Sequence, residues 1–142
     1  MIRCSNASGK STFIKSLAIN ALLAQSIYTC MAKKMVIPRV TIITSMAVRD
    51  EVLSGESYYI KEIKYMKRII QALNEKKPVF CVIDEILRGT NTEERIAASA
   101  AILEYLYEKN CIAVVATHDI ELTRLLPEMQ LSYWSIWIFR KR

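Results

Sequence analysis

Apolar residues recur at helical spacings in several stretches of this chain, and short apolar runs without polar alternation lie between them. This pattern predicts helices over residues 10–27, from just after Gly55 to residue 73, over 93–109 and over 120–126, and strands over 40–43, 79–83 and 111–116. Strands that lack polar alternation and are separated by helices are typical of a parallel sheet that is covered on both faces. The pattern therefore predicts an α/β fold with a mostly parallel sheet.

The composition supports one folded domain over residues 1–142. Apolar residues make up 52% of the 142 residues, and the chain contains only three Gly and three Pro, so it can bury a core. The formal net charge of +6 favours a polyanionic partner such as a nucleotide or DNA, although charge alone does not select one.

Cysteine usage and hydropathy exclude several classes of protein. The four cysteines, Cys4, Cys30, Cys81 and Cys111, are widely spaced and form no CxxC pair, and His118 is the only histidine, which argues against a zinc site. We expect free thiols in a reducing compartment. The chain has no uninterrupted apolar stretch of about eighteen residues and no signal pattern, so we expect a cytoplasmic protein that does not enter a membrane.

A phosphate-binding loop is predicted directly before the first helix. Its residues are Cys4, Ser5, Asn6, Ala7, Ser8, Gly9, Lys10, Ser11 and Thr12. Consecutive backbone N–H groups at a helix N-terminus form a cradle for phosphate. Lys10 would reach the β- and γ-phosphates and the Ser11 hydroxyl would bind Mg²⁺, but Cys4 stands where the pattern has its first glycine.

Two adjacent carboxylates follow the apolar run over residues 79–83. In an open parallel sheet, ligands bind at the carboxyl ends of the strands, which is where Asp84 and Glu85 are expected. Asp84 would contribute to the Mg²⁺ shell, and Glu85 would act as the general base that polarises the attacking water. His118 follows Thr117 at the end of the next predicted strand, where its imidazole could sense the γ-phosphate.

Several of these segments resemble the ATPase domain of the MutS family. The run from Asp84 to Thr92 is similar to that family's DE-x-x-RGT-[SN]-T signature, and residues 50–62 are similar to its D-x-x-x-SG-x-S-x-[FY]-x-x-E element. Asn6 matches the family's loop, where Ser5 replaces the usual Pro, and His118 matches the histidine of its ATH motif. The ERIAAS and THDIEL segments are closer to a divergent MutS-like branch.

The resemblance implies a P-loop NTPase of the ABC-type ATPase class that uses ATP and Mg²⁺. It implies nucleotide binding by Asn6, Ala7, Ser8, Gly9, Lys10, Ser11 and Thr12, with Glu85 and His118 as catalytic residues and Ser11 and Asp84 at the metal. It further implies that Ser57 reaches the nucleotide of a second subunit, so we expect a homodimer of the intact parent, which binds DNA through domains that this chain does not contain. The activity implied is ATP binding and hydrolysis in DNA mismatch repair or DNA processing, coupled to DNA-bound dimer states.

Both ends of the chain depart from the family's pattern. Only Met1 to Arg3 precede Cys4, and no family motif matches residues 130–142, an atypical tail ending in LSYWSIWIFRKR, so we interpret the chain as a fragment. Two alternatives stay open. One is a transporter-type or SMC-type ATPase subunit, although no LSGGQ-like segment precedes Asp84. The other is a non-catalytic remnant, which Cys4 and the short ends would favour.

Overall fold

Four helices and four strands alternate in the part of the chain that the structure describes. The computed structural model describes residues 9–46, 58–75, 77–125 and 136–140. The elements are α1 (Lys10–Ser26), β1 (Thr41–Ser45), α2 (Tyr58–Leu73), β2 (Val79–Asp84), α3 (Thr92–Glu108), β3 (Cys111–Ala116), α4 (Glu121–Leu125) and β4 (Ile136–Arg140). The predicted helices and the first three strands are therefore present, with bounds shifted by a few residues.

The strands form one sheet in the order β1-β2-β3-β4. β1, β2 and β3 run parallel, with Ile43 opposite Cys81 and Cys81 opposite Ala113. β4 pairs with β3 in the opposite direction. The predicted mostly parallel sheet is confirmed. No strand was predicted inside the tail over residues 130–142, where Ile136–Arg140 pairs with β3.

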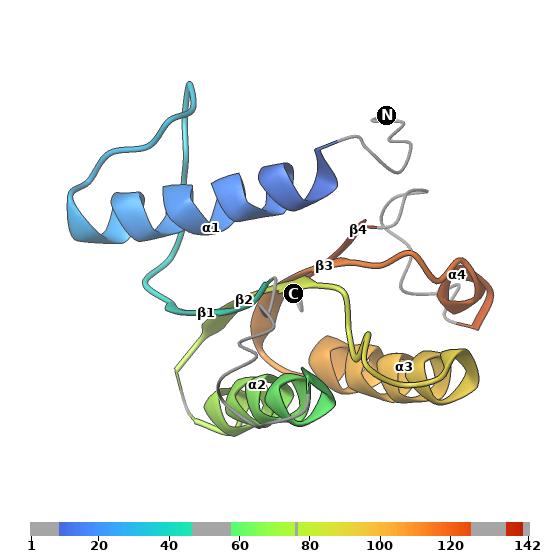
Figure 1. Ribbon diagram of the computed structural model, residues 1–142. Coiled ribbons are helices and arrows are strands. Elements are labelled where there is room, and N and C mark those ends of the chain that lie inside the picture. The colour runs from blue at the N-terminus through green and yellow to red at the C-terminus, as the bar shows by residue number, and fades with distance from the viewer. Residues whose placement is uncertain (1–8, 47–57, 76, 126–135, 141–142) are drawn as a thin grey trace.

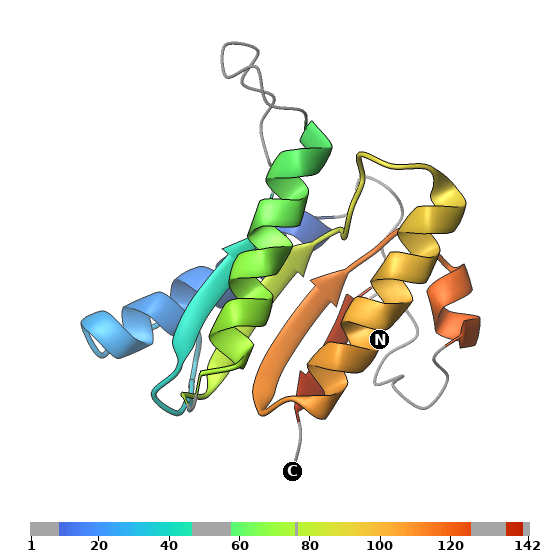
Figure 2. The same ribbon diagram turned by 90° about the horizontal axis from the view of Figure 1, so that it is seen from below.

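Helices cover both faces of this sheet, as expected. Figure 1 shows α1 on one side of the strands and α2 and α3 on the other, and Figure 2 shows α2 and α3 lying across the same face. β2 has no polar residue before its last position, and its side chains alternate between the two layers. Val79, Cys81 and Ile83 face α2 and α3, whereas Phe80 and Val82 face α1.

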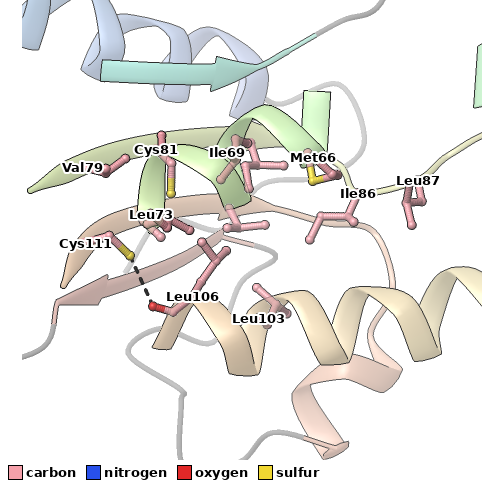
Figure 3. Close-up of a cluster of buried hydrophobic side chains, with 14 of the residues drawn as sticks. Met66, Ile69, Leu73, Val79, Cys81, Ile86, Leu87, Leu103, Leu106 and Cys111 are labelled. Atoms are coloured by element: carbon pink, nitrogen blue, oxygen red, sulfur yellow. Dashed lines mark hydrogen bonds between the residues drawn. The ribbon is translucent and has the colours of Figure 1, made fainter. Parts of the chain in front are cut away.

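The larger core lies between the sheet and helices α2 and α3 (Figure 3). Each helix presents buried residues at helical spacing, which include Met66, Ile69 and Leu73 on α2 and Leu103 and Leu106 on α3. This periodicity explains why both helices pack along the strands.

The described cysteines are free thiols, as expected, and two of them belong to this core. The Cys111 Sγ donates a hydrogen bond to the Leu106 carbonyl oxygen at 3.2 Å (Figure 3). A hydrogen bond with Cys111 and burial raise the pKa of the Cys81 thiol well above its ordinary value, whereas the same hydrogen bond lowers the pKa of Cys111. Cys4 lies outside the described residues.

Candidate functional site

The segments that follow β2 and β3, together with the beginning of α1, bring polar side chains to the carboxyl edge of the parallel strands. Asp84 ends β2 opposite Ala116, which ends β3. The Glu85 backbone N–H donates to the Ala116 carbonyl oxygen at 2.9 Å, so the two chain segments stay adjacent just beyond the strands. His118 follows two residues after Ala116, and this geometry places it beside Glu85.

Three residues from separate predicted motifs form a continuous chain of contacts. The Lys10 Nζ lies 3.2 Å from the His118 Nδ1. The His118 Nε2 lies 3.1 Å from a Glu85 carboxylate oxygen. The structure therefore brings Lys10, Glu85 and His118 together, although 108 residues separate Lys10 from His118 in the sequence.

The same contacts fix the tautomer of the imidazole. A lysine ammonium group has donors and no acceptor, so the His118 Nδ1 accepts the bond from Lys10. The ring proton then resides on Nε2, which donates to the Glu85 carboxylate. In this arrangement the ring connects the loop lysine to the predicted general base.

Glu85 is held on both of its oxygens. The Arg88 Nε donates to the second carboxylate oxygen at 2.6 Å, and Arg88 itself is half-exposed. The backbone at Glu85 is also unusual, because its φ of 67° lies in the left-handed region, and Leu87 follows with a φ of 52°. Left-handed backbone at non-glycine residues costs free energy and is found at functional sites.

A small cleft of about 240 Å³ opens at this edge. Its lining consists of Glu85, Ile86, Arg88, Arg95, Thr117, His118 and Asp119. Lys10 reaches it through its contact with His118. The cleft therefore contains both predicted catalytic residues, Glu85 and His118, while Lys10, Ser11 and Asp84 lie outside its lining.

The remaining predicted site residues have different placements. Gly9 has a φ of 76° and precedes α1, and the Phe13 N–H donates to its carbonyl oxygen at 2.8 Å. Ser11 and Thr12 are exposed in the first turn of α1, and Asp84 is partly buried. Predicted binding residues Asn6, Ala7, Ser8 and Ser57 lie outside the described residues.

The loop after Glu85 is anchored on α2 by a buried carboxylate. The Gly89 N–H donates to a Glu62 carboxylate oxygen at 2.9 Å, and Glu62 is only 5% exposed. A Cβ at Gly89 would lie 3.1 Å from the Tyr58 side chain and from Tyr59, so the close approach of the loop to α2 favours glycine. This contact links two sequence segments that resembled family motifs.

Sequence reasoning missed three charged residues of the site. Arg88 pairs with Glu85, and Arg95 forms a bidentate ion pair with Asp119. All three lie inside segments that resemble the family, but periodicity does not indicate which distant charges will pair.

The described residues were compared with the requirements of a metal centre formed by protein side chains and of a membrane-spanning helix. Within these residues, no three His, Cys, Asp or Glu side chains gather to hold a metal ion. None of the helices described has the length and apolar character needed to span a bilayer.

The fold and the cleft define an α/β protein in which a loop-to-helix junction faces two strand ends that carry Glu85 and His118. Residues 1–135 match the family model described as MutS domain V. The chain belongs to the MutS family.

Individual relatives agree with this assignment. The chain is 39% identical to the DNA mismatch repair protein MutS of Thermotoga neapolitana, over 88% of this chain and 16% of that protein. It is 36% identical to the protein of the same name from Thermotoga maritima, with the same coverage of both chains. For the Thermus thermophilus protein the identity is 33% over 88% of this chain and 15% of the relative. The chain thus spans about a sixth of the length of these relatives.

Proposed function

We propose that this chain binds Mg-ATP and hydrolyses ATP as the P-loop module, of the ABC-type ATPase class, in a MutS-like protein. The observation that carries the proposal is the contact chain from Lys10 through His118 to Glu85, because it joins three motifs that were predicted independently. In the relatives, the name DNA mismatch repair protein describes the whole molecule. For this chain, coupling of the ATP cycle to DNA-bound dimer states is part of the proposal.

The residues divide into a group that binds the ground state and a group that acts on the transferred phosphoryl group. Lys10 supplies a positive charge to the β- and γ-phosphates, and the backbone around Gly9 supplies N–H donors. Ser11 and Asp84 offer the hydroxyl and carboxylate oxygens that Mg²⁺ accepts next to phosphate, and the ion neutralises phosphate charge when bound. Asn6, Ala7, Ser8 and Thr12 complete the loop in this proposal.

Glu85 and His118 are proposed to act during hydrolysis. Glu85 accepts a proton from the attacking water, which requires that one of its two present contacts, with Arg88 or with His118, be released. His118 has its proton on Nε2 and can donate to a γ-phosphate oxygen once the ring leaves the carboxylate. The Lys10 Nζ contacts the His118 ring. Phosphate binding at Lys10 and release of His118 therefore both involve this Lys10–His118 contact.

The site is proposed to be completed by a second subunit. Ser57 would donate to the nucleotide of the partner in a homodimer, and a missing donor of that kind typically costs on the order of a hundredfold in rate. We therefore expect slow turnover from dilute chain and a higher specific activity as concentration rises. DNA is expected to contact other parts of such a protein.

Calorimetric titration with Mg-ATP, paired with a turnover assay, tests these roles. Lys10→Ala is expected to weaken binding by at least about tenfold, because it removes a ground-state phosphate contact. Glu85→Gln is expected to retain binding and to lower turnover by about a hundredfold or more. Lys15→Ala removes an exposed lysine from the same helix and is the matched control.

Three results would contradict the proposal. One is a wild-type chain that binds no nucleotide, and another is an equal loss of affinity in Lys10→Ala and Glu85→Gln. The third is a Lys15→Ala variant as impaired as Lys10→Ala, since it would show that only bulk charge matters.

A further inference from the structure

A bidentate ion pair joins α3 to the segment that carries His118. The Arg95 Nε donates to one Asp119 carboxylate oxygen at 2.9 Å, and its Nη2 donates to the other at 2.6 Å. The side chains are 24% and 11% exposed, so water competes only partly for these bonds. Two parallel N–H···O bonds fix orientation as well as distance, which a single contact cannot do.

The residues on either side of His118 are both held in place. Thr117 is buried, and its hydroxyl oxygen accepts a bond from the Asp119 backbone N–H at 3.1 Å, closing a turn around His118. Asp119 is held by Arg95. His118 itself is 48% exposed, so little packing restrains its ring. The direction of the ring therefore depends mainly on its anchored neighbours and on its contacts with Lys10 and Glu85.

Arg95 is itself fixed to the segment that follows Glu85. It lies in the first turn of α3, and its backbone N–H donates to the Asn91 carbonyl oxygen at 3.0 Å. The Asn91 side chain caps the helix by accepting from the Glu94 N–H at 2.9 Å. The ion pair thus connects the segment after β2 to the segment after β3, and both partners line the same cleft as Glu85 and His118.

We propose that Arg95 and Asp119 are positioning residues that hold the backbone at His118, so that its ring lies between Glu85 and Lys10 in the ligand-free chain and stays within reach of the γ-phosphate when nucleotide binds. This role rests on the function proposed above, and neither residue is required to touch the nucleotide. The pair sets the separation of the two segments that carry the general base and the proposed γ-phosphate contact. A displacement of about 1 Å in such a site can cost on the order of a hundredfold in rate.

Three substitutions in this ion pair should release the His118 ring to different degrees. Arg95→Lys keeps the positive charge but replaces the planar guanidinium group with a single ammonium group. The His118 ring should therefore be only partly ordered. Asp119→Asn keeps the shape of the side chain but loses the charge and one acceptor oxygen. Arg95→Met keeps most of the aliphatic stem and removes both bonds, so it should release His118 most fully.

Because the chain contains a single histidine, NMR can observe this ring without assignment ambiguity. We would record the His118 Cε1–H and Cδ2–H resonances of the ligand-free chain for the wild type, Arg95→Met, Arg95→Lys, Asp119→Asn and Arg124→Met. Arg124 is an exposed residue of α4 that does not line the cleft, so its variant controls for loss of one positive charge. Methyl resonances of the core report whether each variant is folded.

In the wild type and in Arg124→Met, the ring resonances are expected to differ clearly from those of a histidine peptide. In Arg95→Met and Asp119→Asn they should move to the peptide values while the core methyl resonances stay in place, with Arg95→Lys between the two. A folded Arg95→Met with wild-type ring resonances would overturn the proposal. If Arg95→Met does not fold, the isosteric Asp119→Asn decides in the same way.

Measurements with added nucleotide distinguish this proposal from the proposed function. Mg-ADP and a non-hydrolysable Mg-ATP analogue are added to each variant, and kcat and KM are measured with ATP. Arg95→Met should lose the analogue-specific shift of His118 and about tenfold to a hundredfold in kcat, with KM within about twofold. A wild-type chain that binds no nucleotide would refute the proposed function, while the ligand-free spectra would still decide whether the pair orders His118. A decrease in kcat for Arg124→Met as large as that for Arg95→Met would overturn the positioning role.

Discussion

On one face of the sheet, α2 and α3 cover the strands with a core of large aliphatic side chains, which include Ile69, Leu103 and Leu106. On the other face, α1 contributes one large buried side chain, Ile14, together with two alanines. Its outer side leaves Phe13, Ile19 and Leu22 substantially exposed. The helix that begins at Lys10 therefore contributes fewer large buried side chains than α2 and α3 together contribute on the opposite face.

This difference has a consequence for the site. Glu85 and His118 belong to segments that continue directly from the central strands and are linked to α3 through the Arg95–Asp119 pair. Lys10 belongs to the helix with fewer large buried side chains. We infer that ligand-driven movement at the cleft is easier for α1 than for the two strand ends, because moving α1 disturbs fewer packed side chains.

The largest expected effect is the loss of packing in the core between α2 and α3. Leu103 is completely buried, so Leu103→Ala should lower the free energy of unfolding by about 2–5 kcal/mol. Urea unfolding followed by circular dichroism measures this change. Leu22→Ala on the exposed side of α1 is the control and should change stability by less than about 0.5 kcal/mol.

Ile14→Ala sharpens this comparison, because Ile14 is as fully buried as Leu103 but lies on the α1 face. Its effect should be concentrated in α1, with faster amide hydrogen exchange there than in β2 and β3. Exchange that accelerates equally in all three elements would show that the two faces unfold as one unit and would remove the proposed difference.

A smaller effect is expected where α2 reaches the loop after Glu85. Glu62→Ala removes the acceptor of the Gly89 N–H and should cost about 1–3 kcal/mol, because a hydrogen bond to a charged group is lost. Glu62→Gln retains an acceptor oxygen and should cost less. If the two variants are equally destabilised in urea, the hydrogen bond to Gly89 is not the reason for the loss.

The smallest expected effect lies at the beginning of α3. Asn91→Ala removes the helix cap and should cost about 1 kcal/mol at neutral pH, measured by thermal unfolding. The hydroxyl of Thr90, and then Asn91, lower the pKa of Glu94 below its ordinary value of 4.5. A depressed carboxyl pKa stabilises the fold above the unfolded value and loses that contribution as pH falls through the folded value.

Thr90→Val tests this sign directly. It removes the hydroxyl that donates to the Glu94 carboxylate at 2.6 Å. Its cost should be larger at pH 7 than below the Glu94 pKa, where the carboxyl group is protonated in both states. A cost that grows as the pH falls would contradict the proposed contribution of Glu94.

The sequence predicted the layered α/β fold because strands buried on both faces have no polar interruptions, as in Val79–Asp84. It did not predict β4, because an antiparallel strand at the end of a tail has no flanking helix to mark it, and its apolar run was interpreted as an atypical segment. Glu85 and His118 were placed correctly at strand ends by topology alone. The contacts of His118 with Lys10 and with Glu85 depend on side-chain directions that no periodicity encodes.

The partners of Glu85 and Asp119 were unpredictable for a related reason. Arg88 lies three residues after Glu85, and Arg95 lies 24 residues from Asp119, so neither spacing distinguishes a pair from two solvated charges. The left-handed backbone at Glu85 was equally hidden, since nothing in its residue type requires a positive φ.

The left-handed conformation of Leu87 limits how this protein can be engineered. Protein engineers often stabilise a turn by placing glycine at a non-glycine position with positive φ, which recovers about 1 kcal/mol of backbone strain. Leu87 is only 5% exposed and its side chain belongs to the core beside Ile86. Replacing Leu87 with glycine would remove a buried side chain, and the free energy lost in this way exceeds the backbone strain that glycine relieves. Thermostabilising libraries should therefore leave this position unchanged, even though backbone geometry alone would select it first.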